Sequence, residues 1–323
     1  MSKFQGKQQI IESLLPLTEH LRFVTIDQEN IAAFCSRLHG RHFIPSAWNQ
    51  DFIYSPLDQS GIDYFLVFNS INFCYWGSPK WTVTYRDQDR DGAWGMLAAL
   101  TRALEEKYPI LEGDYLGKIT KGDLTKILRG NVTIPLFSQR LNILREVGKV
   151  LTADFDGHFH HLLEAAEGSA VKLVDLLVEN FPSFDDSVEW EGHHLLFYKR
   201  AQLGAAMLGE RWHAHKIELF TDLDQLTVSA DYKLPQVLRD LGILKYEPPL
   251  ARMIDENRRL PANSREELEI RAATILAGEE MTEILRKRIK GVTSQHVDRL
   301  IWLAGQKKTS RDKPYHKTLT TAY

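Results

Sequence analysis

Apolar residues recur along most of this chain at the three- and four-residue spacing of amphipathic helices. We expect Pro16 to end the first such segment, and Asp123 and Gly130 to cap a short one. The segments with helical spacing are residues 8–16, 28–39, 93–107, 123–130, 136–151, 169–181, 193–212, 265–286 and 294–306. The pattern therefore predicts a mainly α fold.

Little of the chain has the alternating pattern of a half-buried strand. Residues 80–86 alternate and are β-branched, so they are the best strand candidate, whereas the apolar run 64–76 fits either a helix or a strand. No internal repeat or linker divides the chain, which favours a single helical domain over residues 1–323 with a small β element. The polar tail 310–323 is expected to be extended and to pack on the surface.

Composition excludes several classes of protein. The 323 residues are 43% hydrophobic and 26% charged, as in ordinary globular proteins, and the net charge of -3 gives no overall attraction to nucleic acid or an anionic membrane. No apolar stretch approaches the ~18 residues of a membrane span, and the N-terminus is too polar for a secretory signal. Two lone cysteines, Cys35 and Cys74, indicate a reducing compartment. We therefore expect a cytoplasmic protein without a membrane partner.

The stretch LTVSADYKLPQVLRDLGIL, residues 226–244, places a carboxylate inside an apolar run. Pro235 suits the first turn of a helix, so Asp231 lies about one turn before the usual capping position. We expect an extended connection there, with the carboxylate near the positive end of the helix dipole. A surface loop acid is the simpler interpretation, but the flanking Leu226 and Val228 favour partial burial and a functional site.

Other candidate residues each have an ordinary structural explanation. Asp298 borders the apolar face of SQHVDRLIWLAG, where a salt bridge to an arginine would account for it. Lys199 lies among apolar neighbours, either extending its ammonium to solvent or contacting a phosphate. Trp48 and Phe73 belong to aromatic stretches that are either core or a stacking wall for a planar heterocycle.

Histidines cluster at His158, His160 and His161, with further pairs at residues 193–194 and 213–215. The chain has no HExxH motif and no paired-cysteine spacing, so we interpret these histidines as solvated polar surface and expect no metal. It also has no phosphate-binding glycine loop, dinucleotide fingerprint, nucleophile elbow or kinase signature. No cofactor is therefore expected.

A more specific set of motifs runs from about residue 40 to the C-terminus. It comprises FNSINFCYWG, PSFDDSVEWEG, FYKRAQL, LTVSADYKLPQVLRDLGILKY, LEIRAATI, VDRLIWL and KPYHKTLTTAY. Together these motifs resemble the queuosine salvage protein family, and Ala-Asp-Tyr-basic-x-Pro-Gln at residues 230–236 is the most specific of them. The resemblance implies a helical fold related to helix-hairpin-helix DNA glycosylases. It also implies hydrolysis of queuosine 5'-monophosphate to release queuine for reuse in transfer RNA.

The resemblance assigns roles to four positions. Asp231 takes the place of the catalytic carboxylate, and Ser229 stands where the family often has a base-contacting Phe. Asp298 matches a substrate-binding Asp, and His42 corresponds to a family His in the N-terminal aromatic loop. In this chemistry a carboxylate stabilises the oxocarbenium-like ribose or attacks it as a nucleophile, and a second carboxylate accepts two N–H donors of a guanine-like edge. The remaining expected contacts are stacking from Trp48, Phe73 or Tyr232 and phosphate binding by Lys199 and Lys233.

Two departures from the family pattern keep other functions open. Arg299 and Leu303 replace a Tyr and an Asp of the family stretch that contains Asp298. A non-catalytic helical protein that binds queuine or a nucleotide would tolerate such changes. The other alternative is a nucleic-acid glycosylase of related fold, against which the net charge of -3 argues.

Overall fold

The computed structural model describes residues 3–43, 48–306 and 312–323, and within them the chain is mainly helical, as expected. Each longer helix buries one stripe of apolar side chains, as the spacing predicts. The fourteen α-helices of these residues are α1 (Lys7–Thr18), α2 (Gln28–Ser36), α3 (Gln59–Ser70), α4 (Gly92–Glu105), α5 (Gly113–Lys118), α6 (Lys121–Ile127), α7 (Phe137–Asp154), α8 (Phe159–Ala165), α9 (Ala170–Asn180), α10 (Lys199–His213), α11 (Lys233–Asp240), α12 (Pro248–Asp255), α13 (Arg265–Arg286) and α14 (Ser294–Ala304).

Three small antiparallel sheets complete the described fold. The pairs are β1 (Val24–Ile26) with β6 (Leu244–Tyr246), β2 (Thr82–Tyr85) with β3 (Gln88–Asp91), and β4 (Ser187–Trp190) with β5 (His193–Leu196). The β2–β3 hairpin confirms the strand predicted at residues 80–86. The other two pairs were not predicted, because β1 and β6 are only three residues long and the sequence of β5, HHLL, does not alternate.

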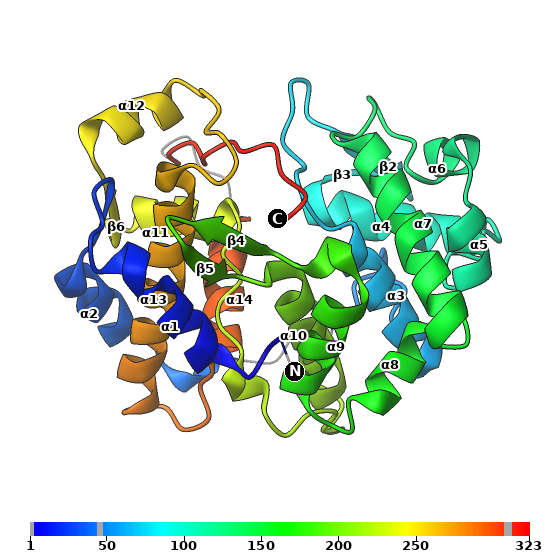
Figure 1. The fold of residues 1–323 in the computed structure, drawn as a ribbon, viewed down its shortest axis with the longest axis horizontal. Helices are drawn as coiled ribbons and strands as arrows, with labels where there is room; N and C mark the ends of the chain where they lie inside the picture. The colour runs from blue at the N-terminus through cyan, green and yellow to red at the C-terminus, as the bar shows by residue number, and fades with distance from the viewer. Residues whose placement is uncertain (1–2, 44–47, 307–311) are drawn as a thin grey trace.

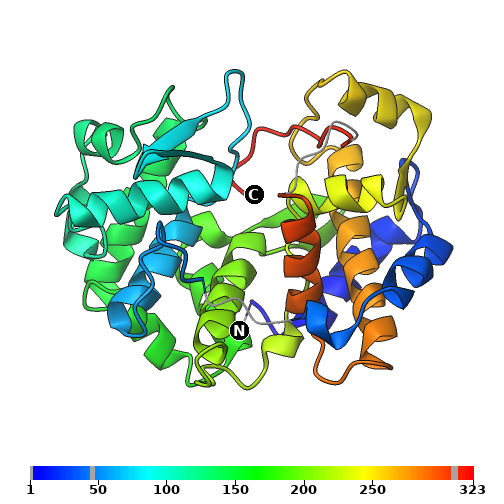
Figure 2. The same cartoon turned by 180° about the vertical axis from the view of Figure 1, so that it is seen from behind.

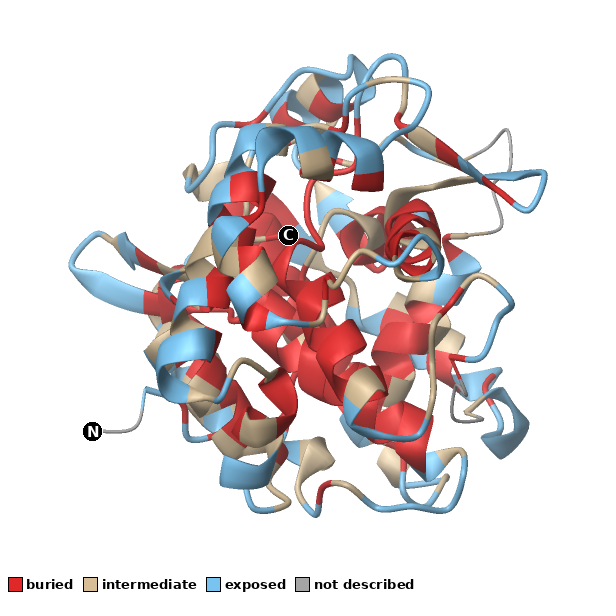
Figure 3. Ribbon diagram, turned by 90° about the vertical axis from the view of Figure 1, so that its right-hand side faces the viewer, coloured by how far each residue is buried: buried red, intermediate tan, exposed pale blue. Residues whose placement is uncertain are grey.

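The helices form two groups on either side of α10. Figure 1 shows α3 to α8 in one group and α1, α2 and α11 to α14 in the other, and Figure 2 shows the same division from behind. Buried residues, red in Figure 3, concentrate on the inner helices. Both α10 and α13 are buried along most of their length. No described helix has the length and apolarity needed to cross a membrane.

The predicted helix over residues 193–212 is wrong in its first part. Residues 193–196 form strand β5, and α10 begins only at Lys199. The cause is a tight turn before the strand, where Glu191 and Gly192 have φ angles of 49° and 81°. Two successive positive φ angles match the right-handed twist of a hairpin, so the chain folds back on β4.

Three expected helix boundaries are also wrong. Gly130 does not cap α6, which ends at Ile127 with Leu128 as its C-cap residue. Pro16 does not end the first helix but lies inside α1, where the buried Leu17 continues the apolar face. The cap of α6 is Thr120, whose hydroxyl accepts the backbone N–H of Asp123. Asp123 returns a bond to the start of the helix, so it occupies the third position of a capping box.

Residues 64–76, whose pattern was ambiguous, and the C-terminal tail meet near the centre of the molecule. The run 64–76 is helical up to Ser70 in α3 and irregular beyond it. The tail is extended over residues 312–323 but is not confined to the surface, because His316, Thr318 and Tyr323 are buried. Figure 1 shows the red tail ending between the two helix groups, where the backbone N–H of Cys74 donates to the Tyr323 carbonyl at 2.9 Å.

Candidate active site

A cavity of about 1170 Å³, including its open mouth, lies between the two helix groups. Its walls come from the end of α3, the start of α4, one face of α10, the segment leading into α11, the helix α14 and the C-terminal tail. These elements are far apart in sequence, so only the folded chain assembles the cavity. A concave site lined by apolar and polar side chains from several elements is typical of small-molecule binding sites.

Asp231 lies at the wall of this cavity, directly before α11. Its Oδ1 accepts the backbone N–H groups of Lys233 at 2.6 Å and Leu234 at 3.0 Å, so its side chain bonds to the first turn of α11 from the position before the N-cap residue, Tyr232. This corrects the expectation that it lies a turn too early, because α11 begins at Lys233 rather than at Pro235. Within the described part of the chain Oδ2 accepts no hydrogen bond. One carboxylate oxygen is thus held rigidly while the other is available to a ligand.

Residues 226–230, just before Asp231, are extended and hydrogen-bonded to two helices, and they are called the clamped segment below. The side-chain carbonyl of Gln202 on α10 accepts the backbone N–H of Thr227 at 2.8 Å. The amide of Gln295 on α14 donates to the Thr227 carbonyl at 2.6 Å. Leu226 and Val228 are buried, and Asp231 is partly buried, as its apolar flanks predicted. An extended chain buried in this way must obtain its hydrogen bonds from side chains, and it does so here.

A buried ion pair between Arg271 and Asp186 also supports the clamped segment. The guanidinium of Arg271, on α13, forms two hydrogen bonds with Asp186, at 2.9 and 2.6 Å. Its Nε also donates to the carbonyl of Ala230, the residue before Asp231. Asp186 in turn accepts the backbone N–H of Lys199 at the start of α10. The pair therefore ties the Asp231 segment to two of the central helices.

Asp298 reaches the cavity from α14 and is only 7% exposed. Its Oδ2 accepts the backbone N–H of Ser229 at 2.5 Å. The pKa of Asp298 is raised to about 7, mainly by burial and to a lesser extent by the charge of Asp231, against the lowering effects of the bond from Ser229 and the charge of Lys199. The carboxyl therefore titrates near neutral pH when the cavity holds no ligand. Such a shift inside a cleft is typical of functional sites.

Two more ionisable side chains line the cavity. Lys199 is buried and interacts electrostatically with both Asp231 and Asp298, while burial lowers its pKa. Glu210 accepts the indole N–H of Trp48 at 3.1 Å and forms an ion pair with Arg299 at 3.2 Å. Burial raises the pKa of Glu210 to about 7, against the effect of Arg299. With Asp91, which also lines it, the cavity thus combines four carboxyl groups with the buried Lys199.

Aromatic rings cover two sides of the cavity. Trp48 and Trp302 have ring centroids 6.3 Å apart, and the ring of Trp94 lies 4.9 Å from that of Trp302. On another side, the rings of Tyr232 and Tyr315 are 4.9 Å apart. Flat aromatic surfaces around polar groups suit a planar heterocycle with hydrogen-bonding edges.

The structure brings together all but one of the candidate residues from the sequence. Those lining the cavity are Trp48, Phe73, Lys199, Ser229, Asp231, Tyr232, Lys233 and Asp298. His42 is not among the lining residues; it is exposed, and its ring bonds to the backbone of His39 and stacks on the ring of that residue. Of the two departures from the family pattern, Arg299 lines the cavity, whereas Leu303 is exposed on α14 outside it.

Several lining residues had no signal in the sequence. Glu210 appeared to be an ordinary acid near the end of a helix, and Tyr315 and Tyr323 belong to a tail expected on the surface. Trp94 lies at the start of a regular helix pattern, which gives no sign of a site. The two tyrosines become site residues because the tail returns between the helix groups, and residue spacing does not encode that path.

Comparison with known proteins identifies relatives of the whole chain. The sequence profile of the family described as queuosine salvage protein matches residues 53–323. The chain is 39% identical over 307 residues to queuosine 5'-phosphate N-glycosylase/hydrolase of Sphaerobacter thermophilus, covering 95% of each chain. It is 30% identical over 338 residues to the protein of the same name from Mus musculus, covering 97% of this chain and 98% of the relative. The Bos taurus protein of that name is 31% identical over 284 residues, with 82% of each chain covered. The chain belongs to the queuosine salvage protein family.

Proposed function

We propose that this protein is an N-glycosyl hydrolase that cleaves queuosine 5'-monophosphate between queuine and ribose 5-phosphate. The names of its relatives give the reaction and the substrate. The observation that carries the proposal is the joint presence of Asp231 and Asp298 in one aromatic-walled cavity. The freed queuine is then available for reuse in transfer RNA modification.

Asp231 acts on the sugar in this mechanism. Departure of the base leaves positive charge on C1' of the ribose, which a fixed carboxylate stabilises electrostatically or attacks to form a covalent intermediate. Its Oδ1 is already held by two backbone N–H groups, so little reorganisation is needed as the charge develops. The N-terminus of α11, the positive end of the helix dipole, lies directly after this carboxylate. Water then completes the hydrolysis.

Asp298 contacts the base. Queuine is a 7-deazaguanine, so it lacks the ring nitrogen at position 7 on which protonation could assist departure of the base. A guanine-like edge presents two adjacent N–H donors, which one carboxylate accepts together. Asp298 suits this role because it is buried in the cavity and already hydrogen-bonded to the Ser229 backbone. The rings of Trp48, Phe73 and Tyr232 supply stacking surfaces.

The 5'-phosphate requires cations in the same cavity. Lys199 and Lys233 both line it, and Lys199 interacts electrostatically with Asp231 and Asp298. A phosphate in contact with Lys199 would compensate the cost of keeping its ammonium charged in a buried position. We therefore assign phosphate binding to these two lysines.

The proposal extends to the fold and the cellular setting. One continuous core of buried side chains supports a single domain over residues 1–323, and the helical composition supports an architecture of the helix-hairpin-helix glycosylase type. Both cysteines are free and buried, which supports a cytoplasmic location. A small nucleotide fills the proposed site, so the proposal includes no stable nucleic-acid or membrane partner.

The direct test is incubation with three compounds, followed by mass spectrometry for the freed base. Queuosine 5'-monophosphate should yield queuine, whereas guanosine 5'-monophosphate should yield no guanine. Queuosine itself reports how strongly the phosphate contributes to recognition. Failure to release queuine from the 5'-phosphate would reject the proposed function.

A further inference from the structure

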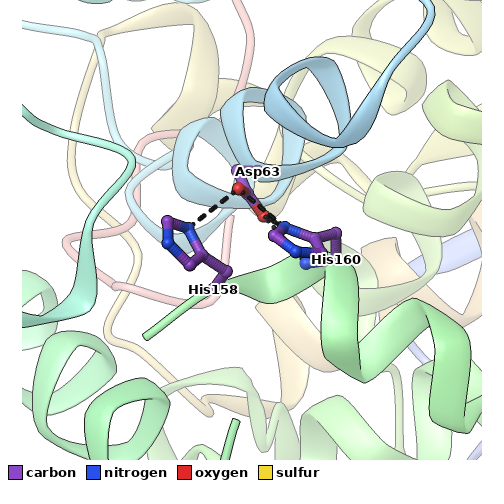
Figure 4. A group of neighbouring side chains, drawn as sticks. All are labelled: Asp63, His158 and His160. Carbon is purple, nitrogen blue, oxygen red and sulfur yellow. Dashed lines mark hydrogen bonds and ion pairs between the residues drawn. The ribbon is translucent and has the colours of Figure 1, made fainter. Parts of the chain in front are cut away.

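Two histidines and an aspartate converge on the far side of α3 from the cavity. Figure 4 shows Asp63 on α3 facing the rings of His158, at the start of α8, and His160, within it. The Nδ1 atoms of His158 and His160 lie 3.2 and 3.0 Å from Asp63 Oδ2. None of the three residues lines the cavity. The prediction that this histidine cluster is solvated surface is wrong for His160, which is 8% exposed.

The carboxylate of Asp63 is buried with little charge compensation. It is 3% exposed, and its ion-pair partners among the described residues are the two imidazoles. Imidazoles that stay neutral leave a full negative charge in the interior, which is costly. A proton shared with the histidines or a bound cation would remove that cost.

The arrangement of the two carboxylate oxygens favours the cation. Asp63 Oδ1 accepts the backbone N–H of His160 at 2.8 Å, which fixes the carboxylate and turns Oδ2 toward both rings. The three potential ligand atoms lie within 4.8 Å of one another. Ligand atoms of tetrahedral zinc are about 3.3 Å apart for bonds of about 2.0–2.1 Å, close to the two nitrogen–oxygen distances here. The side chain of His158 is 34% exposed, so water can reach the group from that side.

We propose that Asp63, His158 and His160 form a binding site for a divalent transition metal, with Zn²⁺ as the expected ion and water as the fourth ligand. Two neutral imidazoles and one carboxylate are ligands that zinc accepts. The metal would link α3 directly to the start of α8. Because Phe68 near the opposite end of α3 and Asn72 just beyond that end both line the cavity, this link would help to hold that wall in place. Its role is structural, and the ion takes no part in the chemistry of the proposed cleavage reaction.

The test uses the full chain without a polyhistidine tag, stripped of metal by a chelator and titrated with zinc chloride in a calorimeter. One Zn²⁺ per chain should bind, and thermal unfolding should move up by a few degrees at saturating zinc. Cobalt(II) in place of zinc should give the visible absorption of a tetrahedral ion. These measurements do not depend on turnover, so they stand apart from the test of the proposed function.

Variants identify the ligands. His160→Gln and His158→Gln should each weaken zinc binding at least about tenfold. His158 is partly exposed, so its replacement leaves the fold intact even if the His160 variant unfolds. The matched control is His194→Gln, because His194 is an exposed histidine bonded to a single carboxylate, Glu189; zinc binding should be unchanged. Absence of saturable zinc binding, or equal affinity in the wild type and the His158 variant, would overturn the proposal.

Discussion

The carboxylate of Asp298 accepts the backbone N–H of Ser229, so an acid on α14 is bonded to the segment that carries Asp231. This contact fixes the position of one acid relative to the other. It also brings two negative charges near each other, which is one reason why the pKa of Asp298 is raised, and Lys199 interacts with both. In the proposed reaction one acid contacts the base and the other the sugar, so this contact sets the geometry of the scissile bond.

Replacing Asp231 by Asn tests the sugar-side role. The amide oxygen of Asn can still accept the N–H groups of Lys233 and Leu234, so the start of α11 should remain intact. The negative charge is lost, and queuine release should fall by about 10²- to 10³-fold or more. Single-turnover release of queuine, measured by mass spectrometry, reports this loss without interference from product release.

A matched control for Asp231→Asn is Asp224→Asn. Asp224 is a half-exposed acid in the 3-10 turn just before residues 226–230, and it does not line the cavity. Its replacement should leave turnover unchanged. Normal turnover by the Asp231 variant would remove this residue from the mechanism.

Asp298→Ala should weaken binding of free queuine. The change removes an acceptor for the base edge and leaves the Ser229 N–H without its partner. Charged hydrogen bonds contribute about 1.5–3 kcal/mol each, so affinity should fall about 10- to 100-fold. Calorimetric titration with queuine gives the dissociation constant directly. An unchanged constant would contradict the assignment of Asp298 to the base.

Affinity for queuine and stability of the free protein should depend on pH in opposite directions. Burial raises the pKa of Asp298 from 3.8 to about 7. Only the ionised carboxylate accepts two N–H donors, so affinity should rise with pH up to about 7. The free folded protein holds this proton more tightly than the unfolded chain. Asp298 therefore stabilises the fold below about pH 4, and that contribution is lost as the pH rises to about 7.

Chemical denaturation and queuine titration between pH 5 and pH 8 check both trends. Asp298→Asn should remove most of the pH dependence of affinity. Glu210→Gln is the comparison, because burial also raises the pKa of Glu210 to about 7 without making it the acceptor for the base. The Glu210 variant should flatten the stability profile yet keep the pH dependence of binding. If affinity fell as the pH rose from 5 to 7, the ionised form of Asp298 would not be the binding form.

Sequence patterns located most of the helices and much of the site, for physical reasons that differ. Helical spacing records which face is buried, so α4, α9 and α14 could be predicted from it. Asp231 was conspicuous because a carboxylate beside buried apolar residues needs partners, and the structure supplies the backbone of α11. Local conflict of this kind is typical of functional positions.

What the sequence could not predict depends on long-range packing. The Glu191–Gly192 turn converts an apolar run that resembled a helix into strand β5. Tyr323 became buried because the tail returns to the centre, where its hydroxyl donates to Glu267 at 2.7 Å. The partners of Asp63 likewise come from another element, so only the fold shows that His160 faces a buried carboxylate.

The close approach of α13 to the clamped segment gives a test of how far the position of Asp231 controls turnover. A Cβ atom at Gly278 would lie 2.6 Å from Cγ1 and 2.7 Å from Cγ2 of Val228, so Gly278→Ala must displace the valine. Val228 lies three residues before Asp231, and misplacement of a reacting group by about 1 Å can cost about 10²-fold in rate. We expect that loss in Gly278→Ala and its partial recovery in the double variant with Val228→Ala, where the new methyl group fills the space of those removed.

Gly122→Ala on α6, where the added Cβ meets its nearest atom at 3.6 Å, should keep normal turnover. Steady-state rates of queuine release are measured for Gly278→Ala, Val228→Ala, the double variant and the Gly122→Ala control. If the losses of the two single variants simply add in the double variant, the contact between Gly278 and Val228 does not position Asp231.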